Sequence, residues 1–494
     1  MDTFTKNYWS MYLDFLNDYK ELTYRGYSLP YLCHFRSLVR EIEPNFYKKD
    51  FIHHCKHIIT DSREIQEEFN RYLNTMEQKS SKPKKGKIVF HDVYNLLRMP
   101  MQTFTMNFKG YPIIRLSEGP SPSLMDSSKQ IVKGKPAQQM KGLVFKKIKN
   151  AKTANQTAIA IPVDYFDKYT IDTSGSIGKV KSMAKKIFQR YENHILYSNS
   201  KFRSVFFMQL TKIINRFEEA ENFLTKNNVA CVVVPSTHYL ESRVLVIVAK
   251  TKGIPTICMQ HGIISSEIGY LPKIARVDAV HGVYEREWFY KNGAPDGSIE
   301  VIGHPRFDLM RHPPKISREV FHQQLGIDPS KKTLLIAVRG NKNLKGWKRF
   351  IKALSSNTDL NIILKDYPTK KSHSLTEIFP FVKSITKYKL YDILHNVDIV
   401  ATYSSTVGLE AMILGKPVFI FGTNFEGNTG YFSPDYEFVE KKPEALADKV
   451  RQYMTNIRRE QIVASQQEFL KHAYPMKFSS GNRLRKLVDK LMKE

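Results

Sequence analysis

The chain has 494 residues, a formal net charge of +28 and 42% apolar residues, with aromatic residues at 12%. This length accommodates two or three domains, and this composition excludes an intrinsically disordered chain. Apolar runs such as Val229–Pro235 are too short to span a bilayer, and the first residues lack the apolar stretch of a signal peptide. The four cysteines are scattered without a C-x-x-C pair, which predicts reduced thiols in a cytoplasmic protein.

The positive charge indicates an anionic partner: nucleic acid, an anionic membrane surface or a polyanionic substrate. The sequence has no zinc-finger, RNA-binding aromatic or helix-turn-helix pattern, so no nucleic acid is expected. An anionic glycan or the membrane is favoured, and the latter would place the protein peripherally on the inner face of the cell membrane. Basic residues concentrate in 79–152, where Lys, Gly, Pro and Ser predict loops that form either an acceptor cleft or a solvated surface.

Residues 1–76 are interpreted as a helical N-terminal extension, because their aromatic residues recur near helical spacing. A basic linker at Glu77–Gly86 leads into alternating strands and helices over 87–307, an N-terminal Rossmann-like acceptor domain. The expected strands are Lys87–Phe90, Val229–Pro235, Ile254–Met259, Asp278–Gly282 and Ile299–Ile302, and the expected helices are Ile177–Tyr197, Ser204–Asn227 and Ser236–Lys252.

The alternation restarts over 331–475, after a boundary near Asp308–Ser330, and predicts a C-terminal Rossmann-like nucleotide-sugar domain. Its expected strands are Thr333–Val338, Asn361–Leu364, Val397–Ala401 and Val418–Phe421, and its expected helices include Trp347–Leu354, Tyr391–His395 and Glu444–Phe469. Residues 476–494 form a basic amphipathic helix that lies on a membrane or packs on the protein itself. The predicted fold class is α/β, with two doubly wound domains facing a cleft.

The segment Ala401–Gly422 carries the strongest functional signal. Ser404, Ser405 and Thr406 fall where a helix is expected to begin, and free N–H groups with the helix dipole bind phosphate there. The plainer interpretation is that Ser405 or Thr406 only caps this helix. Gly408 lacks a Cβ, so we expect a ligand to approach the first turn closely. Glu410 lies one turn further, within reach of sugar or ribose hydroxyls.

The letters S-S-T-V-G-L-E-A followed by G-K-P-V resemble the donor-site segment of nucleotide-sugar glycosyltransferases with the GT-B fold. Within that group the chain resembles transferases of capsule and teichoic-acid type surface polysaccharide biosynthesis, over roughly residues 229–450. The resemblance implies that the hydroxyls meet the donor diphosphate and that Glu410 meets ribose or sugar. It also implies an acceptor that is a surface glycan or a lipid-linked oligosaccharide.

His261 ends an expected strand, where an imidazole with a near-neutral pKa could remove a proton from an acceptor hydroxyl. Gln260-His261-Gly262 resembles the H-G element of the same transferases, in which the histidine is regarded as catalytic. Gly303-His304-Pro305-Arg306 resembles their G-x-P-R-x-D element. Arg306 there binds phosphate, pairs with Asp308 or has a structural role between the domains.

Arg339 and Lys365 follow successive strands of the C-terminal domain and are expected to offset the negative charge of the leaving nucleotide. The chain has Lys365-Asp366-Tyr367-Pro368 where the teichoic acid group has K-x-H-P, which argues against a glycerol-phosphate or ribitol-phosphate donor. Neither a D-x-D nor a P-loop is present, so no essential metal or other cofactor is expected.

These residues favour a glycosyltransferase with His261 as base. In this interpretation alanine at Glu410 or His261 removes transfer and leaves folding intact. An isomerase resembling UDP-N-acetylglucosamine 2-epimerases is the first alternative, although those enzymes have H-V-E-A-G where this chain has Met259-Gln260-His261-Gly262. A non-enzymatic scaffold that binds a polyanion is the second.

Overall fold

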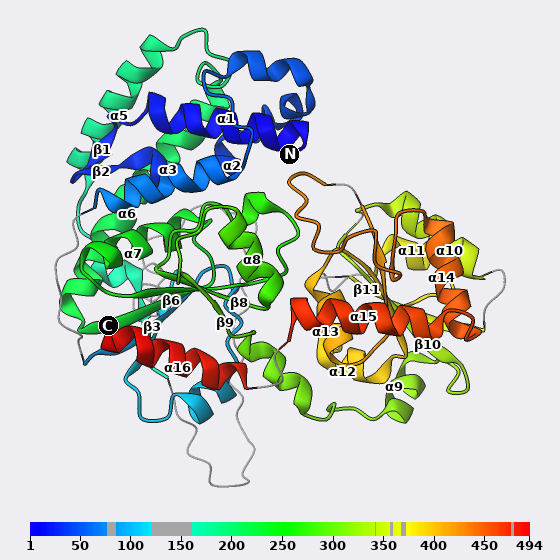
Figure 1. The fold of residues 1–494 in the computed structure, drawn as a ribbon. Helices are drawn as coiled ribbons and strands as arrows, with labels where there is room; N and C mark the ends of the chain where they lie inside the picture. Colours follow the sequence, from blue (N-terminus) through cyan, green and yellow to red (C-terminus); the bar gives the residue numbers. More distant parts are fainter. Residues whose placement is uncertain are drawn as a thin grey trace, which may run out of the picture.

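The computed structural model describes residues 1–76, 85–119, 161–340, 342–355, 359–366, 372–423, 425–475 and 479–494. It contains two parallel β-sheets in two lobes that lie beside one another (Figure 1). The predicted α/β class with two Rossmann-like doubly wound domains is confirmed. The loops expected within 120–152, most of the linker Glu77–Gly86 and the Tyr367-Pro368 pair lie outside the described residues.

The N-terminal domain holds a sheet of seven parallel strands in the order β5-β4-β3-β6-β7-β8-β9. Strands β4 and β5 were not predicted, because they are short and lie beside the basic, Gly- and Pro-rich segment. The strands are β3 Lys87–Asp92, β4 Ile113–Ser117, β5 Val163–Tyr165, β6 Val229–Val234, β7 Thr256–Met259, β8 Val277–Val280 and β9 Ile299–Val301. The helices are α5 Ser174–Arg190, α6 Ser200–Lys226, α7 Leu240–Thr251 and α8 Val283–Lys291, with short helical turns η4 Thr103–Asn107, η5 Phe166–Tyr169 and η6 Glu267–Gly269.

The C-terminal domain holds six parallel strands in the order β12-β11-β10-β13-β14-β15. The strands are β10 Lys332–Val338, β11 Leu360–Asp366, β12 Lys383–Ser384, β13 Ile399–Tyr403, β14 Val418–Phe421 and β15 Val439–Glu440. The helices are α9 Arg318–Leu325, α10 Leu344–Ser355, α11 Ser374–Ile378, α12 Leu390–Asn396, α13 Thr406–Ile413, α14 Pro443–Met454 and α15 Arg459–Ala473. The prediction of one helix over Glu444–Phe469 is wrong, because the chain turns between α14 and α15, where Asn456 has a φ of 62°.

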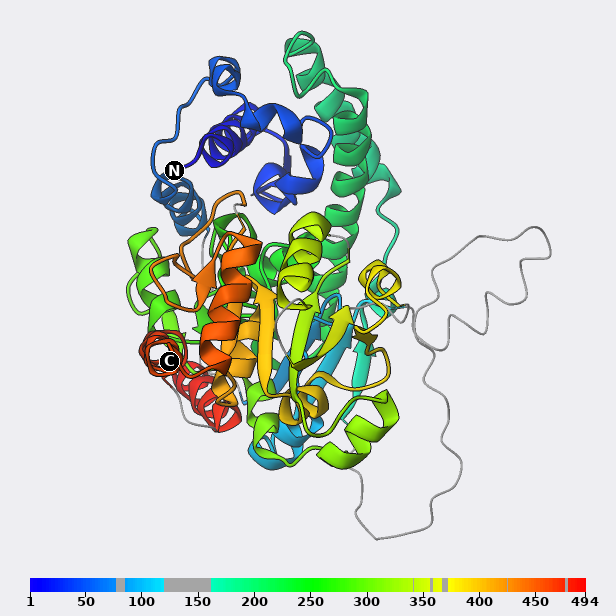
Figure 2. The same ribbon diagram turned by 90° about the vertical axis from the view of Figure 1, so that its right-hand side faces the viewer.

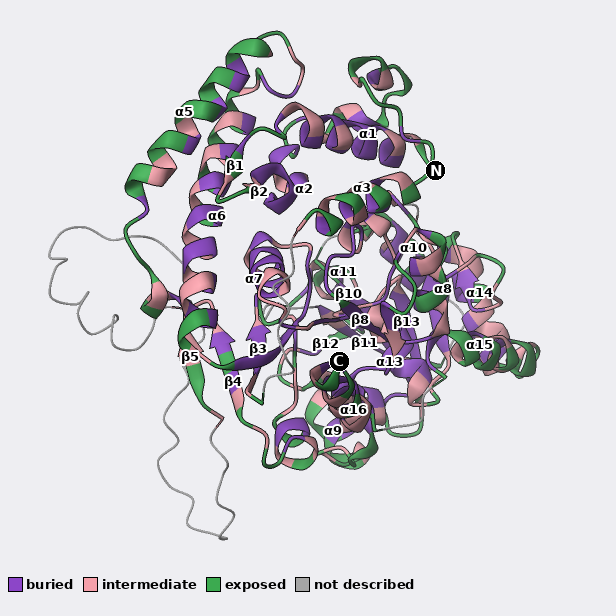
Figure 3. Cartoon of the chain, turned by 60° about the vertical axis from the view of Figure 1, so that its left-hand side comes forward, coloured by how far each residue is buried: buried purple, intermediate pink, exposed green. Residues whose placement is uncertain are grey.

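The extension is a compact layer of helices and turns that packs on α6 and α5 (Figures 1 and 3). Its aromatic residues are core residues: Phe15 lies 5.5 Å from the Phe206 ring of α6, and Tyr19 lies 5.1 Å from it. The apolar core of the extension is continuous with one face of the N-terminal sheet. Its elements are α1 Thr3–Asp18, β1 Thr23–Tyr24, β2 Tyr27–Ser28, η1 Leu29–Leu32, α2 Phe35–Leu38, η2 Glu43–Tyr47, η3 Lys49–His54 and α3 Arg63–Asn74.

The chain passes between the domains twice, through η7 Pro305–Arg311 and again after α15. The second passage returns α16 (Ser480–Lys493) to the N-terminal sheet, where Leu484, Leu487 and Val488 are buried with strand residues. Burial of such side chains stabilises by about 1.5–3 kcal/mol each. Of the two interpretations of this basic amphipathic helix, the structure therefore shows packing on the protein itself. No helix among the described residues has both the length and the apolar character needed to cross a membrane.

Candidate active site between the two domains

A cleft of about 850 Å³ lies at the carboxyl ends of β10, β13 and β14, on the side of the C-terminal domain that faces the N-terminal domain. The strand order of each sheet reverses beside its first strand, and ligands of doubly wound domains bind at such a point. Arg339 and Ser404, which follow the adjacent strands β10 and β13, both line the cleft. The lining residues are Arg36, Ser265, Ser266, Arg339, Lys342, Asn343, Trp347, Tyr403, Ser404, Phe421, Gly422, Thr423, Phe425, Glu426 and Lys441.

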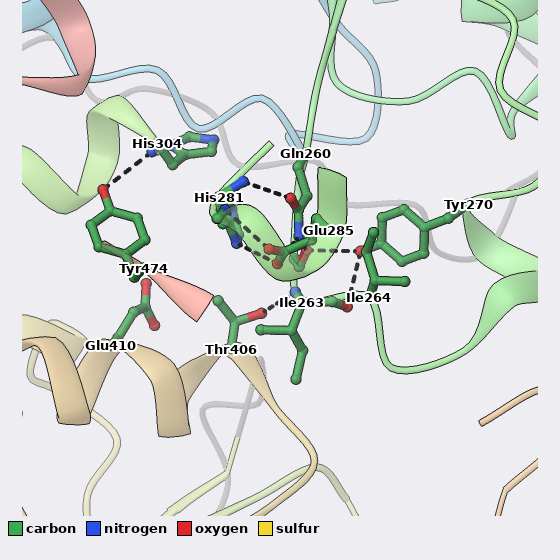
Figure 4. A network of polar contacts seen from close by, with 12 residues as sticks. Gln260, Ile263, Ile264, Tyr270, His281, Glu285, His304, Thr406, Glu410 and Tyr474 are labelled. Atoms are coloured by element: carbon green, nitrogen blue, oxygen red, sulfur yellow. Dashed lines mark hydrogen bonds and ion pairs between the residues drawn. The ribbon is translucent and has the colours of Figure 1, made fainter. Parts of the chain in front are cut away.

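The three hydroxyls at the start of α13 have three different surroundings. Ser404 lines the cleft. The Ser405 side chain caps the helix and accepts a hydrogen bond from Val407 N–H at 3.3 Å. Thr406 Oγ1 accepts a hydrogen bond from the backbone N–H of Ile263 at 3.2 Å, so it joins α13 to the N-terminal domain (Figure 4). The sequence placed all three on the donor phosphates, whereas this geometry leaves Ser404 as the side chain that faces the cleft.

The loop that carries Arg339 is held in place by two neighbouring side chains. The backbone N–H of Gly340 donates to Asp366 Oδ1 at 2.8 Å, and the Gly340 carbonyl accepts from His373 Nε2 at 3.0 Å. Lys365 precedes Asp366 on β11 but is not among the residues lining the cleft. Burial lowers the pKa of the Lys365 ammonium. The structure thus brings Arg339 and Ser404 together and leaves Lys365 outside the cleft lining.

Gly408 and Glu410 face the interior of the protein. A Cβ on Gly408 would lie 2.9 Å from Ile420 Cδ1 and 3.3 Å from Thr402 Cγ2, so this glycine allows α13 to pack closely on its sheet. That corrects our expectation that the missing Cβ makes room for a ligand. Glu410 is 4% exposed, and its Oε1 lies 3.3 Å from Arg306 Nη2 and accepts a hydrogen bond from the Tyr391 hydroxyl.

Arg306 and His304 stand at the first passage between the domains. Arg306 pairs with Glu410 across the domain boundary, and Asp308 accepts hydrogen bonds from the N–H groups of Ser479, Ser480 and Gly481 at the start of α16. The sequence left open a pairing of Arg306 with Asp308, but in the structure each of them has a different partner. His304 Nδ1 accepts from Arg306 N–H at 3.1 Å, and burial together with Arg306 lowers the His304 pKa.

His261 follows β7, and its orientation is fixed from two sides. Its Nδ1–H donates to the Pro235 carbonyl at 3.2 Å, which leaves Nε2 as the nitrogen that can accept a proton. Its ring stacks on Tyr270 with the centroids 5.4 Å apart. Burial, opposed by the Pro235 hydrogen bond and reinforced by Arg306, lowers the pKa of His261 to about 4. His261 lines a small cavity of about 20 Å³ beside Ser236 and His238, rather than the large cleft.

A buried polar network fixes the backbone around His261 (Figure 4). Gln260 Nε2 donates to the Gly262 carbonyl at 2.7 Å and to Glu285 Oε1 at 3.0 Å, and Gln260 Oε1 accepts from His281 N–H at 2.8 Å. Burial raises the pKa of Glu285 to about 7. The amide of Gln260 is therefore saturated by protein groups and holds the position of the adjacent His261.

Several cleft residues were not predicted as site residues. Arg36 comes from the extension, and Ser265 and Ser266 come from the loop after β7. Trp347 and Phe421 were predicted only as the first residue of a helix and the last residue of a strand. Trp347 and Phe421 contact each other at a centroid distance of 5.2 Å and have one edge on the cleft. The loop around Glu426 carried no motif. The signal that could have identified these residues is their proximity to the switch point of the C-terminal sheet. That proximity can be recognised only once the strand order is known.

Residues 346–457 match the family model of capsule polysaccharide biosynthesis proteins. This match covers α10 to the end of α14 and includes Ser404, so the resemblance predicted from the Ser404–Val418 segment is confirmed there. None of the curated proteins matches the chain.

Three solved structures share the general arrangement of the chain at low identity. The wall teichoic acid polymerase TagF is 12% identical over 93% of this chain and 98% of its own, with a TM-score of 0.43. HepE of Anabaena in complex with UDP and glucose is 13% identical over 82% and 99%, with a TM-score of 0.45. A UDP-N-acetylglucosamine 2-epimerase is 12% identical over 83% and 96%, with a TM-score of 0.48.

Proposed function

We propose that the protein is a glycosyltransferase of surface polysaccharide biosynthesis, which moves a sugar from a nucleotide-sugar to a surface glycan or a lipid-linked oligosaccharide. The observation that carries the proposal is the placement of Arg339 and Ser404 in one cleft at the switch point of the C-terminal sheet. The family match over 346–457 supports the same class of protein.

In the proposed reaction the acceptor hydroxyl attacks the anomeric carbon of the donor and the bond from that carbon to the diphosphate oxygen breaks. His261 Nε2 accepts the hydroxyl proton. The departing nucleoside diphosphate carries the negative charge, which Arg339, the Ser404 hydroxyl and the N-terminus of α13 stabilise. The hydrogen bond from Ile263 N–H to Thr406 Oγ1 supports the choice of His261, because it holds the loop that carries His261 against the start of α13.

We further propose that the diphosphate is held by these groups without an essential metal ion. Four of the described residues that line the cleft are cationic, namely Arg36, Arg339, Lys342 and Lys441, whereas Glu426 is its single carboxylate. Transfer measured in excess EDTA should equal transfer measured in Mg²⁺. A rate that disappears with EDTA and returns with Mg²⁺ would contradict this part of the proposal. A surface glycan or lipid-linked oligosaccharide as acceptor would place the protein at the inner face of the cell membrane, and we propose that location as well.

A thermal-shift screen across UDP-, GDP-, CMP- and CDP-sugars tests the proposal. One donor class should raise the melting temperature of the wild-type protein, because a ligand that binds the folded state stabilises it. Arg339→Gln and Ser404→Ala should reduce that shift, and the identified donor should then support transfer to a glycan acceptor. Conversion of UDP-N-acetylglucosamine without an acceptor would favour the isomerase. Salt-sensitive polyanion binding with no response to any nucleotide sugar would favour the scaffold.

A further inference from the structure

Arg36 reaches the cleft from outside both Rossmann-like domains. It lies in α2 of the extension, and its side chain is 34% exposed where it lines the cleft. Glu43 holds the guanidinium at 2.5 Å, and the ring of Phe4 lies 5.8 Å from it. The extension therefore presents a positioned cation to the same cavity that Arg339 and Ser404 line.

The extension is bonded to the C-terminal domain at the rim of this cleft. Asp2 Oδ2 accepts a hydrogen bond from Gly427 N–H at 3.0 Å, and the Tyr47 hydroxyl binds the Glu426 carboxylate. Figure 1 shows this loop of the C-terminal domain, in orange, reaching toward the N-terminus, and Figure 2 shows the extension above the same domain.

The N-terminal domain contributes to the same junction. Glu267 accepts hydrogen bonds from Trp9 and from Ser62 of the extension, the latter at 2.6 Å. The backbone N–H of Glu267 donates to the Gly427 carbonyl at 2.8 Å. Three parts of the chain therefore meet at one side of the cleft, and the extension forms a wall of the cavity in addition to the two domains.

The charges in the cleft indicate what Arg36 binds. Glu426, the one carboxylate among the described lining residues, is engaged by Tyr47. Arg36 is anchored on one side by Glu43 and still faces the cavity, so its remaining N–H groups can bind an anion there. A guanidinium is suited to phosphate oxygens, because its planar fork binds two of them at once.

We propose that Arg36 is a donor-binding residue whose guanidinium contacts the diphosphate of the nucleotide-sugar, so that the N-terminal extension completes the donor site. This inference depends on the proposed function. It assigns the first 76 residues a direct part in substrate binding, beyond their packing on the N-terminal domain.

Calorimetric titration with UDP, GDP and CDP and with the corresponding monophosphates tests the inference. Arg36→Gln should weaken binding of the preferred diphosphate by about 10- to 100-fold, as expected for a lost charge-assisted hydrogen bond. Binding of the monophosphate should weaken less. Arg36→Lys keeps the charge without the fork and should give an intermediate loss. Arg40→Ala is the matched control, because Arg40 is exposed in the same segment and does not line the cleft.

The outcomes separate this inference from the proposed function. If the wild-type protein binds none of the diphosphates, that result would contradict the proposed function itself. Wild-type binding that persists unchanged in Arg36→Gln and Arg36→Lys would overturn the role of Arg36 alone. An equal loss for mono- and diphosphate would place Arg36 on a group that both ligands share and would overturn a contact with the second phosphate of the diphosphate. Thermal unfolding of each ligand-free variant shows that any loss occurs in a folded protein.

Discussion

Glu410 and Arg306 form a buried ion pair between the two domains, with side chains 5% and 7% exposed. Burial raises the pKa of the Glu410 carboxyl, and the neighbouring Arg306 opposes that shift. Such a pair contributes little net stability when it is intact, but removing one partner leaves an uncompensated buried charge. This surrounding argues against our expectation that a substitution at Glu410 leaves folding intact.

We predict that Glu410→Gln lowers the free energy of unfolding by about 3–5 kcal/mol. The double variant Arg306→Met/Glu410→Gln should recover part of the loss, because it removes the stranded cation. Urea denaturation measures both effects. Glu444→Gln is the control, since its ion pair with Arg349 is at the surface and its loss should have no measurable effect. Unchanged stability together with lost transfer in Glu410→Gln would support the sugar-binding role instead.

His261 gives a prediction for the pH dependence of transfer. Because burial lowers its pKa to about 4, the imidazole is neutral and able to accept a proton throughout the range above pH 5. An anionic donor bound nearby would offset Arg306 and raise this pKa. The acid limb of kcat/KM, which reports the free enzyme, should therefore lie near pH 4–5 and not at 6.5.

His261→Ala should reduce kcat by about 10²- to 10⁴-fold, the usual contribution of a general base, and should abolish that acid limb. Stopped transfer assays across pH 4–8 measure both quantities. His312→Ala provides the comparison, because this exposed histidine lies outside the cleft lining. Near-normal turnover in the His261 variant would exclude it as the base.

At the scale of elements, α13 offers two adjacent serines with separable roles. Ser405 caps the helix, so Ser405→Ala should cost about 1 kcal/mol of stability and change donor affinity little. Ser404 lines the cleft, so Ser404→Ala should weaken donor binding with little change in stability. Chemical denaturation of the two variants measures their stability, and calorimetry measures their donor affinity. The reverse pattern would show that the capping serine also carries the donor.

The sequence predicted the strands of both domains well wherever a buried strand reads as a continuous apolar run, as in β6, β10 and β13. It failed where local signals were weak, as in β4, β5 and the turn between α14 and α15. Ser404, Ser405 and Thr406 were predicted as one phosphate-binding group because the sequence indicates that they start a helix. It does not show which way each hydroxyl points, and that direction depends on the Ile263 loop of the other domain.

The position of Arg36 shows the same limit at a larger distance. An arginine in a four-residue helix has no motif, and its role depends on how 1–76 folds over a cleft formed by residues more than 200 positions away. Gly408 was predicted to let a ligand approach the first turn of α13, whereas its missing Cβ makes room for Ile420 and Thr402. Close helix–sheet packing could not be separated from ligand contact without the neighbouring strand.

For the whole molecule we predict a loss of stability as the pH falls from about 6.5 to 4. Burial lowers the pKa values of eight histidines, six of them strongly, so these groups make the unfolded chain bind more protons than the folded chain within this window. Stability therefore falls as the pH drops. The six are His34, His194 and His261, each with a pKa of about 4, and His238, His281 and His304, whose pKa values lie well below 6.5.

Six carboxyl groups act in the opposite direction, because burial raises the pKa values of Asp92, Glu219, Glu267, Asp278, Glu285 and Glu410. The pKa of Asp278 is raised to about 6 and that of Glu285 to about 7, so each contributes stability that grows as the pH falls. The histidines outnumber them, and the net effect should follow the histidines. Urea midpoints between pH 4 and 7 measure the balance, and Glu285→Gln should steepen the acid loss. A midpoint that rises toward pH 4 would show that the carboxyl groups dominate.

The two passages of the chain between the lobes lie side by side, since Asp308 binds the start of α16 and the Tyr474 hydroxyl accepts from His304 N–H at 3.3 Å. In Figure 1 the loop of the C-terminal domain drawn in orange reaches the N-terminus at the top of the boundary between the lobes, whereas α16 begins at its bottom. The two domains are thus linked covalently along one edge and joined by hydrogen bonds from the extension along the other. Loss of one such hydrogen bond, worth about 1 kcal/mol, shifts the equilibrium between the joined and the separated edge about fivefold. In the function that we propose, we expect removal of the first few residues to let the nucleotide leave the cleft faster.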